Sequence, residues 1–314
     1  MFLCCGDALF DMFVTKNREG ETVSNVNLAG HVGGSPMNVA TGLARLEHKS
    51  RYFTKLSSDL FGQLMRGHFK ANGIDTELCV DTGLNTTLAI VETQADGSAA
   101  YVFYTDNTAD VSIQSSVLPE TLPADVQVVH FGSYSTAVEP GSSSLMQLAS
   151  RESASRVISY DPNLRPSIEP DIEKWREVYA GYASSANIIK ASDEDIETLL
   201  GKNAEEKFVA DSFAHGAQLV FITRGPDGAS GFSADGQTAH QKGVKVSVVD
   251  TVGAGDTFQA TTLHWMQREG HLKGAAELDG TVDLAACIEL AINAAAATCT
   301  RSGADLPYLS ELPS

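Results

Sequence analysis

The alternation of short β-branched runs with amphipathic helical patterns constrains this chain more than any other feature. Buried strands are predicted at residues 2–6, 51–56, 126–131, 156–160, 187–190 and 218–223. Helical patterns separate or follow them at 36–47, 60–72, 141–151, 172–185 and 205–215. Strands that alternate with helices pair in parallel, and right-handed crossovers place helices on both faces of the sheet. The sequence therefore predicts an α/β fold with a doubly wound, mostly parallel sheet flanked by helices.

Two segments, at about 12–31 and 86–106, depart from this rhythm. Both are rich in β-forming residues, and no helix follows either of them as a crossover. In the second segment Asp96-Gly97 is a hairpin signal. We expect a small antiparallel β-sheet that projects from a single domain spanning residues 1–314. Such a sheet could act as a lid, as the interface of a homodimer, or as both.

The strongest chemical signal lies in the last third of the chain. Strands are predicted within 235–249, and helical patterns follow at 253–269 and 282–300. The turn between them reads Asp250-Thr-Val-Gly-Ala-Gly-Asp256. Gly253, Ala254 and Gly255 have almost no side chain, so their N–H groups can approach an anion closely. The helix N-terminus behind them adds unpaired donors and partial positive charge.

Asp256 lies in this turn, where a carboxylate can accept a proton from an attacking hydroxyl. The alternative is a glycine-rich turn in which the same carboxylate caps the helix. A second motif, Gly33-Gly-Ser-Pro-Met-Asn38, opens an earlier helical pattern. There Ser35 is expected as the N-cap and Pro36 as the first helical residue. Asn38, in the first turn, either binds a ligand or helps to cap the helix.

These two motifs resemble the two signatures of the ribokinase/fructokinase family of sugar kinases, the phosphofructokinase-B-type carbohydrate kinases. Residues 33–46 are similar to its N-terminal signature and residues 250–258 to its C-terminal one. The resemblance implies a ribokinase-like fold with a β lid. It also implies phosphoryl transfer from ATP, with Asp256 as general base and the amides of Gly253, Ala254 and Gly255 around the phosphoryl group.

The resemblance further implies contacts with the sugar. They fall on Asp11, Gly34, Asn38, Asp110, Asn163 and Arg165. Asp11 follows the first strand, and an ionised carboxylate can accept two hydroxyl donors at once. Asn163 and Arg165 follow a strand at the edge where open α/β sheets bind ligands, and they could reach the sugar or the phosphate. Asp110 could instead only begin a turn.

For the nucleotide, Lys190 ends a predicted strand and could offer a point charge to phosphate. The resemblance assigns further ATP contacts to Thr223, Gly225 and Asn293, besides the residues of the glycine-rich turn. Mg²⁺ is expected because the chemistry needs the charge on the phosphates neutralised. Ser192 replaces the Asn of the family's Asn-x-x-Glu motif, so no protein ligand for magnesium is named. A monovalent cation such as potassium is implied at the Asp250 side chain and at the carbonyl groups of Val252, Thr298, Arg301 and Gly303.

The leading functional hypothesis is a fructokinase. The segments that contain Asp110, Asn163 and Arg165 resemble motifs of fructokinases, and this resemblance favours fructose over ribose. Ribokinase, ketodeoxygluconate kinase and a nucleoside kinase such as adenosine kinase are the alternatives within this class. A non-catalytic sugar-binding protein on the same scaffold is the alternative from another class. A dehydrogenase is disfavoured, because no G-x-G-x-x-G follows an early strand.

Charge and cysteine usage bound the partners and the compartment. There are 22 Lys+Arg against 40 Asp+Glu, a formal net charge of −18, which argues against partners such as duplex nucleic acid or an anionic membrane surface. No apolar stretch approaches the length of a membrane span. The five cysteines form no C-x-x-C pair or zinc-ligand pattern, which favours a reducing compartment. We therefore expect a cytoplasmic protein.

Overall fold

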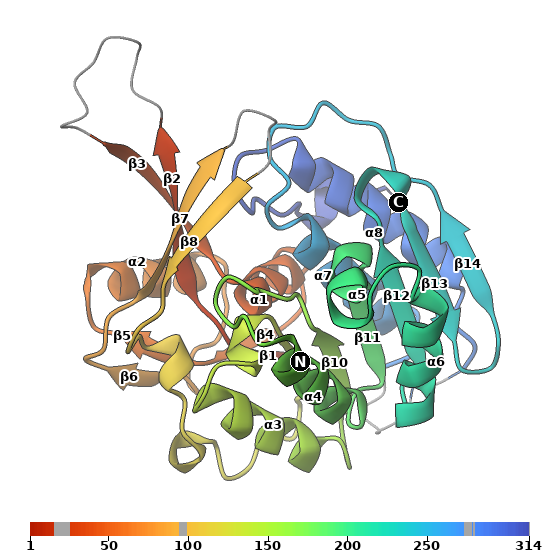
Figure 1. The fold of residues 1–314 in the computed structure, drawn as a ribbon, viewed down its shortest axis with the longest axis horizontal. Coiled ribbons are helices and arrows are strands. Elements are labelled where there is room, and N and C mark those ends of the chain that lie inside the picture. The colour runs from red at the N-terminus through yellow and green to blue at the C-terminus, as the bar shows by residue number, and fades with distance from the viewer. Residues whose placement is uncertain (16–25, 94–98, 273–277, 279, 314) are drawn as a thin grey trace.

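A central eight-stranded sheet organises the computed structural model, which describes residues 1–15, 26–93, 99–272, 278 and 280–313 (Figure 1). The strand order is β14-β13-β12-β11-β10-β9-β1-β4. Their bounds are β1 (Phe2–Cys5), β4 (Ser50–Phe53), β9 (Val128–Gly132), β10 (Val157–Asp161), β11 (Ile188–Ser192), β12 (Leu219–Thr223), β13 (Ala229–Ser233) and β14 (Thr238–Gln241). All pairs from β4 to β12 are parallel, and β13 and β14 are antiparallel. The predicted doubly wound, mostly parallel sheet is confirmed.

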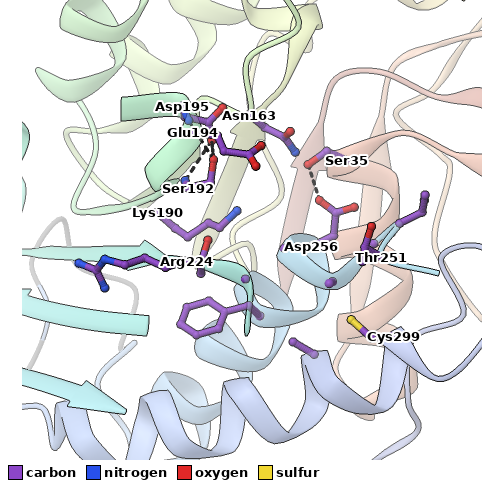
Figure 2. Close-up of a pocket in the computed structure, with 18 of the residues that line it drawn as sticks. Ser35, Asn163, Lys190, Ser192, Glu194, Asp195, Arg224, Thr251, Asp256 and Cys299 are labelled. Carbon is purple, nitrogen blue, oxygen red and sulfur yellow. Dashed lines mark hydrogen bonds between the residues drawn. The ribbon is translucent and has the colours of Figure 1, made fainter. Parts of the chain in front are cut away.

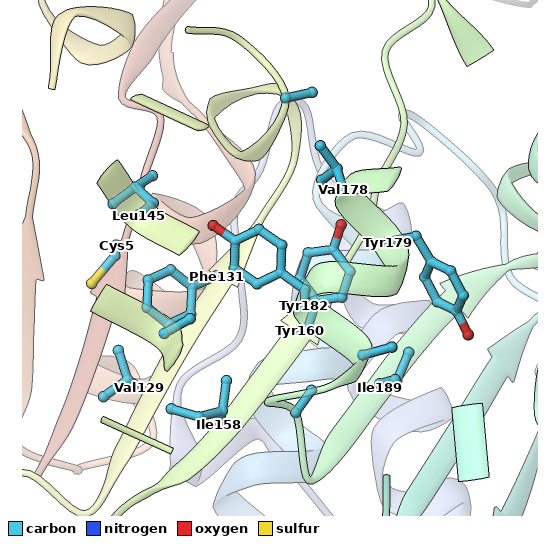
Figure 3. Packing of buried hydrophobic residues seen from close by; sticks show 14 of the residues in the cluster. Cys5, Val129, Phe131, Leu145, Ile158, Tyr160, Val178, Tyr179, Tyr182 and Ile189 are labelled. Atoms are coloured by element: carbon cyan, nitrogen blue, oxygen red, sulfur yellow. The ribbon is translucent and has the colours of Figure 1, made fainter. Parts of the chain in front are cut away.

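Helices cover both faces of this sheet, and two adjacent residues of β1 mark the two faces. Successive side chains of a strand point in opposite directions, so Cys4 and Cys5 enter different cores. The core around Cys5 includes residues of α3 (Gly141–Glu152), α4 (Ile172–Ala183), α5 (Asp193–Leu200) and α6 (Glu205–His215). The core around Cys4 includes residues of α1 (Ser35–Arg45), α2 (Leu60–Ala71), α7 (Ala254–Arg268) and α8 (Leu284–Cys299). Figure 3 shows the first core, in which Tyr160 stacks on Tyr182 with ring centroids 4.5 Å apart.

The small sheet projects from one end of the central sheet, as Figure 1 shows. It contains β2 (Leu9–Thr15), β3 (Asn27–Gly33), β7 (Thr87–Thr93) and β8 (Ala99–Tyr104), in the order β3-β2-β7-β8. The two outer pairs are antiparallel, as expected, but the central pair β2–β7 is parallel. The parallel pair arises because β2 and β7 belong to separate segments of the chain. The turn at Asp96-Gly97 lies outside the described residues.

Three local predictions need correction. The predicted strand at 51–56 is divided between β4 and β5 (Lys55–Ser57), which pairs with β6 (Val80–Thr82). The predicted strands within 235–249 reduce to β14, because residues 242–248 are irregular. The β-branched residues of that segment led to the strand prediction, but Val244 and Val248 are exposed and line a cavity instead of packing in the sheet. The helix α5 was not predicted.

In the described part of the chain, no helix combines the length and the apolarity that crossing a membrane requires. That the chain forms a single domain over residues 1–314 stays a prediction.

Candidate active site

A large cavity opens at the carboxyl ends of the parallel strands, where Figure 2 shows several of its side chains. Its volume is about 1610 Å³. The chain places β4 on one side of β1 and β9 on the other, so the strand order reverses at β1. Ligands of open α/β sheets bind beside such a reversal. The N-termini of α1 and α7 and the inner face of the small sheet complete the wall.

Asp256, in the first turn of α7, lines this cavity and is held by two side-chain donors. Its side chain accepts a hydrogen bond from Ser35 Oγ at 2.6 Å on Oδ1 and from Asn38 Nδ2 at 2.7 Å on Oδ2. Burial raises the pKa of Asp256, while these two donors favour the carboxylate and act against that rise. Each carboxylate oxygen keeps a second lone pair, so Asp256 can still accept a proton from a ligand hydroxyl.

The start of α1 differs from the prediction. The N-cap is Gly34, not Ser35, and Ser35 makes no capping hydrogen bond. Gly34 has a φ of +114°, and a Cβ there would lie 2.5 Å from the Asp7 carbonyl oxygen, so a side chain does not fit. Asp7, which was not among the predicted site residues, accepts hydrogen bonds from the Ser35 N–H at 3.2 Å and from Ser135 Oγ at 2.9 Å. Its place directly after the first strand was the available signal.

Asp11 reaches the cavity from β2, as predicted. It is buried, which raises its pKa to about 7, although the Arg165 guanidinium acts in the opposite direction. A Cβ on the neighbouring Gly33 would lie 2.1 Å from Asp11 Oδ2, so the glycine leaves room for this carboxyl. Asn163 and Arg165 line the cavity from the loop after β10. Asp195 Oδ1 holds that loop by accepting the Leu164 N–H at 2.8 Å.

Asp110 lies elsewhere than expected. It is fully buried at the start of a short 3₁₀ helix, Asp110–Ser112, and is not part of the described cavity wall. Its carboxylate accepts hydrogen bonds from Thr87 Oγ1, Tyr134 Oη and the Val111 N–H. These hydrogen bonds make Asp110 a link between the small sheet and the central domain, and its contact with the sugar stays a prediction.

The glycine-rich turn lies at the N-terminus of α7 and faces the cavity, as predicted. Gly253 is the N-cap with a φ of +79°, and the Ala254 N–H donates to the Thr251 carbonyl oxygen at 3.2 Å. A Cβ on Gly255 would lie 2.9 Å from Lys190 Nζ, so the lysine ammonium adjoins the turn. A cation and a helix N-terminus therefore meet at this point of the wall, which favours an anion there.

Lys190 is buried and pairs with Asp161, Nζ to Oδ2 at 2.9 Å. Burial by itself would lower the pKa of Lys190, but Asp161 and Asp195 outweigh it and raise the pKa. We infer that the lysine stays charged, because Asp161 provides the partner that a buried ammonium requires. The prediction had treated Lys190 as a free point charge, and the structure shows a charge that Asp161 fixes in place.

Three of the four residues predicted around the nucleotide outside the glycine-rich turn, Lys190, Thr223 and Gly225, line the cavity. Asn293 does not line the described cavity, and its Nδ2 donates to the Glu289 carbonyl oxygen at 2.8 Å within α8. The helix presents a different set of residues to the cavity, namely Ile292, Ala295, Ala296 and Cys299. Their helical spacing puts Asn293 beside this stripe and not within it.

The residues expected around a monovalent cation come together in part. The Asp250 carboxylate accepts the Val252 N–H at 3.0 Å and the Gly303 N–H at 2.9 Å. The Arg301 N–H donates to the Thr298 carbonyl oxygen at 3.0 Å. Asp250 therefore ties the loop before α7 to the loop after α8, whether or not a cation binds there.

Together these features place a buried carboxylate beside a turn suited to an anion, an arrangement that fits phosphoryl transfer to a hydroxyl group. Comparison with known proteins leads to the same class. The family model described as pfkB family carbohydrate kinase matches residues 1–311. A fructokinase from Rhizobium leguminosarum bv. trifolii is 37% identical over 263 residues, which are 84% of this chain and 78% of that protein.

Solved structures agree on the fold. An uncharacterized sugar kinase from Pyrococcus horikoshii, in complex with ATP, aligns with a TM-score of 0.81 at 25% identity and covers 99% of this chain and 97% of that one. A fructokinase double mutant from Vibrio cholerae O395, in its fructose, ADP and potassium ion bound form, has a TM-score of 0.81 over 96% and 93% of the two chains. Its identity is 22%, so that likeness concerns the fold alone.

The chain belongs to the pfkB family of carbohydrate kinases. It is a phosphotransferase that acts on a sugar hydroxyl, and the resemblance inferred from its two sequence motifs is confirmed.

The contact between Gly33 and Asp11 gives a first prediction. In Gly33→Ala the new methyl group must displace the Asp11 carboxyl, so we expect KM for the sugar to rise by about tenfold or more with a smaller change in kcat. Gly30→Ala on the same strand is the matched control, because its Cβ would meet only the flexible Met12 Sδ, at 3.0 Å. Steady-state kinetics on both variants decide the matter, and similar rises in the two would contradict the role of Asp11.

Proposed function

We propose that this chain is an ATP-dependent fructokinase, which converts ATP and D-fructose into ADP and D-fructose 6-phosphate. The observation that carries the proposal is the position of the Asp256 carboxylate beside the anion-binding turn, with Asp11 and Arg165 on the same cavity wall. The fructokinase from Rhizobium leguminosarum, at 37% identity, supports fructose as the acceptor.

In the proposed reaction the 6-hydroxyl oxygen of fructose attacks the γ-phosphorus of ATP. A new O–P bond forms, and the bond between the γ-phosphorus and the β,γ-bridging oxygen breaks, so ADP leaves with that electron pair. The hydroxyl proton passes to the Asp256 carboxylate, which therefore has to be ionised beforehand. The Gly253 and Gly255 amides and the Lys190 ammonium, which adjoins Gly255, would stabilise the charge that develops on the phosphoryl oxygens, whereas the Ala254 N–H already donates to the Thr251 carbonyl oxygen.

ATP as the donor is supported by the ATP complex of the Pyrococcus horikoshii kinase. On this chain, Ile292, Ala295 and Ala296 of α8 give one cavity wall an apolar surface of the kind that contacts a nucleotide base. Val244 and Val248, both exposed, belong to the same cavity. The triphosphate would then extend past Thr223 and Gly225 toward Lys190.

The residues present fit the two expected cations unequally. Glu194 offers a cavity-facing carboxylate, the ligand type that Mg²⁺ prefers, while Asp195 already accepts hydrogen bonds from Leu164 and Ser192. Mg²⁺ would be held mainly by phosphate oxygens and water, and it would neutralise charge on the β- and γ-phosphates. For potassium, Asp250 and the Val252 and Gly303 backbones already adjoin one another. We propose a monovalent cation at this point of the loop, and the Vibrio cholerae fructokinase, which shares the fold, is solved with a potassium ion bound.

A kinase assay over a panel of acceptors tests the proposed substrate. Fructose, ribose, mannose, ketodeoxygluconate and adenosine are each titrated at saturating ATP and Mg²⁺, and ADP release is measured. We expect the highest kcat/KM with fructose. A higher kcat/KM with any other acceptor assigns the chain to that kinase class, and absence of turnover with all five would favour the non-catalytic alternative.

The role of Asp256 gives a second prediction. Asp256→Asn keeps the shape of the side chain and removes its basicity, so we expect kcat to fall by about 10²–10⁴-fold. Circular dichroism and a thermal melt confirm that the variant folds. If the folded variant keeps more than about a tenth of the wild-type kcat, Asp256 is not the base.

We also propose a homodimer formed through the small sheet. Its inner face carries Leu9, Asp11, Tyr101 and Phe103, which line the cavity. By alternation, the strand register places a second set on the outer face, whose apolar and aromatic members are Phe10, Met12, Val14, Leu28, Val32, Leu88, Ile90, Val102 and Tyr104. Glu92, which is exposed, lies at one end of the same face, and Leu28, Val102 and Tyr104 are 44%, 58% and 61% exposed. A second copy of the same sheet would bury this surface.

A third prediction follows from this face. Val102→Lys puts a charge on the exposed part of this face, on the edge strand β8, so we expect the molecular mass in sedimentation to fall from dimer to monomer. Gln147→Lys, on the exposed side of α3, is the matched control and should leave the mass unchanged. A monomeric wild type, or a Val102→Lys variant that stays dimeric, would exclude this interface.

A further inference from the structure

The hydroxyl of Ser35 has a position that the proposed sugar and nucleotide contacts do not explain. Ser35 is the first residue of α1, where a serine side chain commonly turns back to cap the helix. Here it makes no capping bond and its Oγ donates to Asp256 Oδ1 at 2.6 Å (Figure 2). Both residues are buried, with exposed fractions of 6% each, so water competes little for this hydrogen bond.

The backbone of Ser35 is fixed from a second side. Asp7 Oδ2 accepts the Ser35 N–H at 3.2 Å, and Asp7 Oδ1 accepts Ser135 Oγ at 2.9 Å. Pro36 follows directly, and its ring fixes the next φ angle. The hydroxyl of Ser35 is therefore presented to Asp256 from a rigid support, which anchors it to the end of β1.

Asp256 needs such a support because the last torsion of an aspartate side chain is soft. Ser35 and Asn38 lie three residues apart on α1 and therefore on one helix face, and they donate to different oxygen atoms of the carboxylate. Two donors on two oxygen atoms define the plane of the group. Asn38 is also expected to contact the sugar, whereas the Ser35 hydroxyl donates to Asp256 and lies next to the helix end.

We propose that Ser35 is a positioning residue, whose hydroxyl holds the Asp256 carboxylate in the orientation from which it accepts the proton of the sugar hydroxyl. This inference rests on the proposed role of Asp256 as the base. The hydrogen bond also favours the ionised form, so it opposes the rise in the pKa of Asp256 that burial causes. Ser35 thus acts on catalysis through Asp256 and does not touch the reacting atoms.

Ser35→Ala tests the proposal. Without the hydroxyl, Asp256 is less well oriented and less readily ionised, so we expect kcat to fall by about tenfold while KM for fructose and for ATP changes by less than about threefold. Because the pKa of Asp256 should rise when the donor is lost, the acid limb of the kcat profile should move to higher pH. Ser35→Thr keeps a hydroxyl and should restore both kcat and the pH profile.

Thr41→Val is the matched control for loss of a buried hydroxyl. Thr41 lies on the same helix, is buried, and donates to the Met37 carbonyl oxygen at 2.9 Å away from the cavity. This variant should show the wild-type kcat and the wild-type pH profile. If Ser35→Ala fails to fold, Ser35→Cys, which has a similar volume and only a weak donor, takes its place in the same measurements.

The Asp256→Asn background separates failure of this inference from failure of the proposed function. If Ser35 acts through Asp256, adding Ser35→Ala to Asp256→Asn should lower kcat by less than about twofold. An active Asp256→Asn enzyme would overturn the base and this inference with it. An inactive Asp256→Asn enzyme leaves the base in place, and then a Ser35→Ala variant with wild-type kcat, or one whose main change is in KM, overturns the role of Ser35 alone.

Discussion

The close crossing of α1 and α7 is the constraint on which the site depends. A Cβ on Gly42 of α1 would lie 2.7 Å from the Ala260 Cβ of α7, so the two helices meet at residues with almost no side chain. One turn earlier on each helix, Asn38 donates to Asp256. Residues four apart lie on the same face of a helix, so the close contact at Gly42 and Ala260 also brings Asn38 and Asp256 together. A larger residue at Gly42 would separate the two N-termini and with them the base from its donors.

The site also depends on several buried acidic side chains, in a chain whose formal net charge is −18. Burial raises the pKa of Asp7 and of Asp11 to about 7, and it raises that of Asp256 as well. Lys190 and Arg165 offset part of this cost for Asp256. Such a cluster is poor at stabilising a fold, because desolvated charges are costly even when paired. It is well suited to bind a polyol and to move a proton. Carboxyl groups with perturbed pKa values are typically found at functional sites of this kind.

The sequence predicted those parts of the site that depend on neighbouring residues. The turn before α7, the place of Asn38 in the first turn of α1 and that of Asp11 after the first strand follow from local patterns, and the structure brings all three to one cavity. The errors concern contacts between distant segments. Asp110 is taken up by donors from β7 and from Tyr134, and Ser35 by an acid more than two hundred residues away. For α5, the capping box of Ser192 and Asp195 is a local signal from which the start of the helix could have been predicted.

The covalent path from the small sheet to the base joins these parts. Strand β3 ends at Gly33, Gly34 turns the chain, and Ser35 begins α1, so one short segment connects the sheet that carries Asp11 to the helix that orients Asp256. Gly34 adopts a φ of +114° with its backbone against Asp7, which fixes the angle between strand and helix. Because Asp11 pairs with His31 of β3, any displacement of Asp11 reaches α1 through only three residues. The proposed contact of Asp11 with the sugar and the proposed orientation of the base would then depend on one continuous segment of backbone.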